Sequence, residues 1–330
     1  MLRILDARTG EPVAAAPARR GLTRIEAYAS GLDPTALRVL LTADLLVRAL
    51  ELGGTPVWAI LTAPHRPAEL RTAATALAIR PFEDGRDLAS GLGEAQVIHV
   101  VAQDTQGPRG EGPLLTVAPV TWTGAAGQDE AGAVDAAERA TDGEVVTVDG
   151  AQRATDGEVD TVDGAAGAPD GAGPGAGPSE AAGPATLDAE PPSERPAPSA
   201  GPAASDAVPP WDLSALLADP AALRLSLLSV PRGTPVRLDP AGLAEAARTL
   251  AGWRRAVAGW SRQPSRPVPE EVRMRLRAAW EDDLDLPGVL TVLRDVADAP
   301  GLPDGARFET YVYADRLLAL DLARDLGSLA

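Results

Sequence analysis

The sequence contains no cysteine and no lysine, and all 30 of its strongly basic residues are arginine. The missing cysteine excludes disulfide bonds, thiolate zinc sites and cysteine nucleophiles. The missing lysine excludes Schiff-base chemistry and a phosphate-binding lysine of the P-loop kind. Any phosphate contact from a permanently charged side chain must therefore come from arginine, which is a geometrically different ligand.

Long uncharged apolar runs are also missing. The most apolar stretch, Leu37–Leu52, is interrupted by Arg38, Asp44 and Arg48, so it does not have the pattern of a membrane span. The first residues contain no apolar run of signal-peptide length. We therefore expect a cytoplasmic protein without a membrane partner.

The charge is distributed unevenly. Residues 124–208 hold 17 acidic residues and 3 arginines, whereas residues 1–123 and 209–330 carry net charges of only −1 and −2. This middle segment is rich in Gly, Ala and Pro and contains a 14-residue tandem repeat, Arg139–Gln152 followed by Arg153–Ala166. Low hydrophobicity with high net charge predicts a disordered linker between two folded blocks. Neither block has the bulk basicity of a DNA-binding domain.

The first block, residues 1–123, alternates strand and helix patterns. Asp33 and Pro34 predict the start of a helix that continues to Leu52, where Gly53 and Gly54 end it. A second helix is predicted over 67–79. Strands are predicted over 2–6, 24–30, 56–63, 95–101 and 114–122. This alternation favours a parallel sheet of βαβ units, that is, a partial Rossmann-like domain.

The second block, residues 209–330, is predicted to be all-α. Apolar residues recur every three or four positions from Leu243 to Trp260, on a helix opened by Asp239 and Pro240. Asp285 is expected to cap a later helix, and this role explains the nearby aspartates better than a metal site does. The other helices are predicted over 213–217, 220–228, 270–282 and 308–326. Four amphipathic helices with short connections form an antiparallel bundle.

Several segments resemble the two ends of a class I aminoacyl-tRNA synthetase of the cysteinyl type, with the mycothiol-pathway cysteine ligase as the next most similar family. In the second block these segments are Asp212–Ala256, Ala279–Asp298 and Tyr313–Leu322; in the first they are Tyr28–Gly31 and Ala43–Val57. The resemblance implies a remnant nucleotide site at Ser30, Gly31 and Thr35. It also implies that the second block corresponds to the stem-contact and anticodon-binding region.

The catalytic motifs of that family are missing. Its His-Ile-Gly-His motif falls on Asp33-Pro34-Thr35-Ala36, which places a carboxylate where the ATP phosphates would lie. Ser30 occupies the position of the zinc-binding cysteine, and His65 and His99 alone cannot form that zinc site. The Lys-Met-Ser-Lys-Ser loop and the second half of the nucleotide-binding sheet have no counterpart. We therefore expect no catalytic residues, no zinc and no bound ATP.

Trp253–Arg277 is the only basic stretch of the chain, and we single out six of its arginines as candidate RNA contacts: Arg254, Arg255, Arg262, Arg266, Arg273 and Arg277. The alternative interpretation is a solvated helical face. We interpret His65 as an ordinary loop residue and His99 as a histidine buried within a strand.

The sequence predicts a catalytically degenerate, cysteinyl-synthetase-like protein that binds tRNA, a full-length synthetase or another protein. The alternative is an active ATP-dependent cysteine ligase with a site rebuilt around Ser30–Thr35. In a third interpretation the repeat linker itself is the interacting element of a scaffold.

Overall fold

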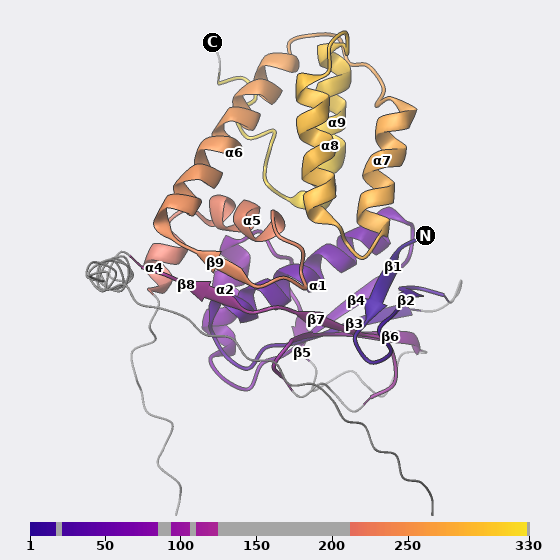
Figure 1. Ribbon diagram of the computed structural model, residues 1–330, viewed down its shortest axis with the longest axis vertical. Helices are drawn as coiled ribbons and strands as arrows, with labels where there is room; N and C mark the ends of the chain where they lie inside the picture. Colours follow the sequence, from indigo (N-terminus) through magenta and orange to yellow (C-terminus); the bar gives the residue numbers. More distant parts are fainter. Residues whose placement is uncertain (18–21, 85–93, 106–109, 125–211, 329–330) are drawn as a thin grey trace, which may run out of the picture. The chain divides into compact units, whose positions relative to one another are not determined.

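The computed structural model describes residues 1–17, 22–84, 94–105, 110–124 and 212–328 (Figure 1). The predicted linker, residues 124–208, lies outside the described residues except for Gly124. The described parts of the two blocks belong to one compact unit, Met1–Ala137 together with Pro209–Ala330. None of the helices in the described ranges combines the length and the apolar character needed to span a membrane.

The first block contains a five-stranded sheet in the order β5-β4-β3-β6-β7, and all neighbouring strands are parallel. The strands are β3 (Leu22–Tyr28), β4 (Val57–Thr62), β5 (Glu83–Asp84), β6 (Glu94–Ala102) and β7 (Leu114–Val117). The predicted parallel βαβ arrangement is confirmed. Side chains alternate along β3, so that Ile25 and Ala27 are fully buried while their neighbours are half-buried.

The helix α1 (Pro34–Leu52) has the boundaries that its sequence predicts. The Asp33 carboxylate accepts a hydrogen bond from the backbone N–H of Ala36, and Gly54 adopts a positive φ of 80° just after the helix. Most of its residues are buried because it packs on the sheet and also against the second block. The helix α2 (Pro67–Ala76) lies beside it.

Three features of the first block differ from the prediction. The predicted strand 114–122 is two strands, β7 and β8 (Val120–Trp122), because Pro119 has no N–H for a continuous ladder. The first strand, β1 (Arg3–Asp6), pairs antiparallel with the unpredicted β2 (Glu11–Ala14), outside the parallel sheet. The two-residue β5 was not predicted either, since it carries no apolar pattern.

The second block contains the predicted helices: α4 (Leu213–Leu216), α5 (Pro220–Leu228), α6 (Pro240–Trp260), α7 (Glu270–Glu281), α8 (Leu286–Asp298) and α9 (Asp304–Leu318). Figure 1 shows α6 to α9 grouped together, with contacts joining α7 to α8, α8 to α9 and α6 to α9.

The last helix was wrongly predicted over 308–326. It begins four residues earlier at Asp304, where Gly305 allows the helix to approach the carbonyl of Pro264. It ends at Leu318 because Ala319 takes the left-handed conformation, with φ 48° and ψ 48°. The block is also not purely helical. The strand β9 (Val236–Leu238) pairs in parallel with β8 of the first block.

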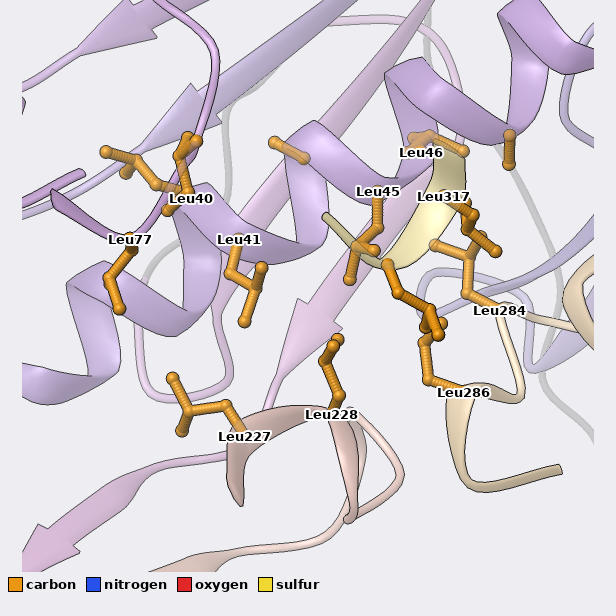
Figure 2. Packing of buried hydrophobic residues seen from close by; sticks show 14 of the residues in the cluster. Leu40, Leu41, Leu45, Leu46, Leu77, Leu227, Leu228, Leu284, Leu286 and Leu317 are labelled. Atoms are coloured by element: carbon orange, nitrogen blue, oxygen red, sulfur yellow. The ribbon is translucent and has the colours of Figure 1, made fainter. Parts of the chain in front are cut away.

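The two blocks share one hydrophobic core. Figure 2 shows leucines of α1 beside Leu227 and Leu228 of α5 and beside Leu284, Leu286 and Leu317 of the second block. Burial of such side chains typically stabilises a fold by about 1.5–3 kcal/mol each. The blocks are therefore parts of one folded body.

Two buried arginines fix the contact between the blocks. Arg38 of α1 donates to the carbonyls of Ala118, Val230, Pro231 and Thr234 at 2.7–3.2 Å. Arg224 of α5 is 1% exposed and donates in the opposite direction, to the Leu77 carbonyl at 2.7 Å and to Asp44 at 3.2 Å. Each arginine thus satisfies polar groups of the other block that would otherwise be buried without a partner.

Candidate functional site

The strands β3 and β6 are neighbours at the point where the strand order of the sheet reverses. After β3 the chain adds β4 and β5 on one side of this strand. It then crosses to the other side of β3, where it adds β6 and β7. In open parallel sheets, ligands bind outside the carboxyl ends of the strands at such a reversal. Ser30 and Gly31 lie in the segment between β3 and α1, and Thr35 is the second residue of α1, so the predicted remnant site lies at this reversal point. Ser30 is exposed, whereas Gly31 and Thr35 are half-buried.

The side chains of Asp33 and Thr35 at this end of α1 already have partners within the protein. Oδ1 of Asp33 accepts from the N–H of Ala36 at 2.8 Å, and Oγ1 of Thr35 accepts from the N–H of Val120 at 3.0 Å. A helix N-terminus attracts anions through its free N–H groups and its dipole. Here a carboxylate of the chain occupies that position, so a phosphate would meet a like charge.

The six candidate arginines fall into two sets. Three of them have partners that reduce their availability. Arg254 donates to the carbonyls of Leu320 and Asp321, Arg273 pairs with Glu270, and Arg277 pairs with Glu281. These arginines stabilise the second block.

The other three, Arg255, Arg262 and Arg266, are exposed and have no carboxylate within ion-pair distance among the described residues. Arg255 lies near the carboxyl-terminal end of α6, whereas Arg262 and Arg266 lie in the segment that follows the helix. No acidic residue occurs from Ala246 to Pro269. The structure therefore narrows the candidate basic surface to these three residues.

His99 and Glu26 form a polar pair on the parallel sheet. The parallel register places them directly opposite each other on β6 and β3, and His99 is 3% exposed. Nδ1 of His99 lies 3.1 Å from Oε2 of Glu26, and Nε2 lies 3.0 Å from the Glu111 carbonyl oxygen. The interpretation of His99 as a histidine buried within a strand is confirmed, although its Nδ1 has no hydrogen-bond partner among the described residues.

Two further side chains of β3 complete this group. The Tyr28 hydroxyl donates to Oε2 of Glu26, and Arg24 forms an ion pair with Oε1 at 2.8 Å. The imidazole of His99 is the main cause that lowers the pKa of Glu26 to about 2, against the opposing effect of burial. Burial and the neighbouring Glu26 raise the pKa of Tyr28. Sequence reasoning missed the group because it depends on which strands are neighbours.

The chain's other histidine, His65, is not a metal ligand candidate. It is exposed after β4 and remote in sequence from the buried His99. In the ranges that the structure describes, no three His, Cys, Asp or Glu side chains are grouped closely enough to hold a metal ion.

A cavity of about 450 Å³ lies at the carboxyl-terminal end of α1, lined by residues that include Leu50, Thr55, Arg277 and Glu281. This is the opposite end of the helix from Ser30 and Thr35.

Comparison with protein-family models finds no family that matches the chain, and comparison with curated proteins finds no matching sequence.

Proposed function

We propose that this protein acts by binding a macromolecular partner and does not activate an amino acid. The proposal extends the resemblance of its segments to cysteinyl-tRNA synthetases and rests on one observation. The amino-terminal end of α1, where that family holds ATP phosphates, is capped by Asp33, and Thr35 bonds to Val120. An enzyme that holds a nucleotide there needs free donors aimed at developing negative charge.

A pyrophosphate-exchange assay tests the loss of activation. The full-length protein is incubated with ATP, radiolabelled pyrophosphate and cysteine, and then with each of the other amino acids. We expect no exchange above the rate without protein. Cysteine-dependent exchange that is lost in a Ser30→Ala or Thr35→Val variant would instead support the alternative, an ATP-dependent cysteine ligase with a rebuilt site.

The exposed arginines support a site for the partner on the second block. Arg255, Arg262 and Arg266 present positive charge without neighbouring carboxylates, which suits contacts to phosphates along an RNA backbone. Among the predicted partners, tRNA fits this surface better than a full-length synthetase does, although the block as a whole is close to neutral. Three such contacts give weak binding that falls steeply with salt concentration.

Fluorescence anisotropy with labelled total tRNA at low and physiological salt measures this interaction. Replacing Arg255, Arg262 and Arg266 together by Gln should abolish binding. The matched control replaces Arg254, Arg273 and Arg277, whose side chains have partners within the protein. Equal loss in both triple variants would show that binding does not depend on these three arginines, and no binding by the wild type at low salt would exclude tRNA and leave a protein partner.

A further inference from the structure

Arg38 is a buried positive charge without a negative partner. The residue is 2% exposed, and its four terminal N–H groups donate to the backbone carbonyls of Ala118, Val230, Pro231 and Thr234. These carbonyls satisfy the donors but carry no net charge. Burial alone lowers the pKa of Arg38, to about 10, so the guanidinium stays charged at neutral pH and no carboxylate of the described residues compensates it.

The other buried arginine at the contact between the blocks does have such a partner. Nη2 of Arg224 lies 3.2 Å from the Asp44 carboxylate. Charges inside proteins are normally paired in this way, because a charge taken out of water loses its hydration. The surroundings of Arg38 therefore favour an anion that the chain itself does not supply.

A small cavity of about 20 Å³ lies beside Arg38, at the contact between the two blocks. Seven apolar side chains form most of its wall, among them Leu228 and Leu286, which Figure 2 shows. The polar side chains of the wall are those of Arg38, Thr42 and Arg232. A cavity needs about 10–15 Å³ to hold one water molecule, so this one takes a single particle of about that size.

Both arginines of this wall have one N–H group without a partner. Nε of Arg232 is buried and has no hydrogen-bond partner among the described residues, while the other two nitrogens donate to the Thr116 carbonyl and to Asp283. In Arg38 the four bonds to carbonyls use both terminal nitrogens, which leaves its Nε–H unbonded within the same ranges. Two unused N–H donors on positively charged side chains of one cavity suit an anion as their common acceptor.

We propose that this cavity binds one chloride ion, which accepts hydrogen bonds from Arg38 and Arg232 and neutralises the buried charge of Arg38. A water molecule accepts the same bonds but leaves that charge uncompensated. Oxyanions such as sulfate and phosphate are too large for a cavity of this volume. Because the wall comes from both blocks, the site exists only in the folded protein, and the ion stabilises the contact between the blocks.

Urea unfolding at increasing chloride concentration tests the proposal, with sodium gluconate keeping the ionic strength constant. A single site of the folded state raises the folding equilibrium constant in proportion to chloride once its concentration exceeds the dissociation constant. We therefore expect a rise of up to about tenfold between about 50 and about 500 mM chloride. Bromide should act like chloride. A wild type whose stability does not depend on chloride would overturn the proposal and leave the cavity to water.

Val230→Leu is the matched variant, because its larger side chain fills the cavity while its backbone carbonyl still accepts from Arg38. The chloride dependence should disappear in this variant. An equal dependence in variant and wild type would mean that chloride acts elsewhere and would refute the site. If the variant does not fold, crystals of the wild type grown in bromide decide the question. An anomalous peak between Arg38 and Arg232 is expected, and a water molecule at that position would contradict the proposal.

Discussion

Removal of the Asp44 carboxylate should destabilise the whole protein, because this buried group joins both blocks. Asp44 of α1 is 1% exposed and lies within 2.8–3.3 Å of Arg48, Arg80 and Arg224. Burial lowers the pKa of Arg224 to about 10, so this guanidinium is still charged at neutral pH. In Asp44→Ala the charge of Arg224 would stay buried without its counter-ion.

This geometry also sets the expected decrease in the free energy of unfolding of Asp44→Ala. Breaking a buried ion pair by removing one partner typically costs about 3–5 kcal/mol. The carbonyls of Leu77 and Leu318 still accept from Arg224 in the variant, so we expect a loss near the lower limit. The double variant Asp44→Ala with Arg224→Met should recover only part of the loss: it removes the unpaired buried charge, but the carbonyls of Leu77 and Leu318 then lose their donor.

Urea unfolding followed by tryptophan fluorescence measures these differences, since the chain has six tryptophans. Glu51→Ala is the matched control. Glu51 pairs with Arg80 but is 44% exposed, and its loss should cost at most about 1 kcal/mol. If Asp44→Ala costs no more than Glu51→Ala, Asp44 does not hold the blocks together. Two separate unfolding transitions in the wild type would refute the single folded unit itself.

Three further predictions concern the fold. Replacing residues 138–208, which lie outside the compact unit, by a Gly/Ser linker of equal length should leave the melting temperature unchanged; a large decrease would show that these residues contribute to the fold. Gly305→Ala should cost about 1–3 kcal/mol, because its Cβ would lie 2.0 Å from the Pro264 carbonyl oxygen, whereas Gly259→Ala on an open face of α6 should stabilise by about 0.5–1 kcal/mol in the same urea assay. Glu26 has a folded pKa of about 2 against an ordinary value of 4.5, so its stabilisation is complete above pH 4.5 and is lost as pH falls toward 2. Glu26→Gln should flatten that part of the stability profile, and an unchanged profile would contradict the pKa assignment.

The local features of the fold could be predicted from the sequence because their causes are local. Asp33, Asp239 and Asp285 each precede a helix, and each side chain accepts from an N–H of the first turn, as their positions indicate. These signals involve residues within a few positions of each other, so no knowledge of the tertiary arrangement is needed.

The features that could not be predicted depend on contacts between distant residues. The β8–β9 pair joins Val120 to Val236, and neither three-residue strand has a distinctive pattern of its own. Arg38 and Asp44 interrupt the apolar pattern of α1, yet both are buried because their partners come from elsewhere in the chain. Similarly, the pairing of Glu26 with His99 follows only from the order of the strands.

The positions of the candidate residues in the chain could be predicted, but not their contacts. The sequence places Ser30 after a strand and Thr35 in the first turn of the following helix, and β3 and α1 agree with this. That this end of the sheet is the reversal point follows only from the strand order. The bond from Val120 to Thr35 depends on the packing of β8 and was not predicted. The carbonyls of Leu320 and Asp321 that bind Arg254 are likewise remote in sequence, whereas Arg273 and Arg277 pair with carboxylates only three and four positions away.

Binding of ATP to the full-length protein tests the central claim most directly, because the proposed function requires that Asp33 close the amino-terminal end of α1. The measurement is the melting temperature as a function of millimolar magnesium–ATP, since a ligand that binds only the folded state raises it progressively as its concentration exceeds the dissociation constant. We predict no change beyond that caused by magnesium and an equal concentration of sulfate. A concentration-dependent increase that is lost in Thr35→Val or Ser30→Ala would contradict the account and place a nucleotide at the reversal point of the sheet.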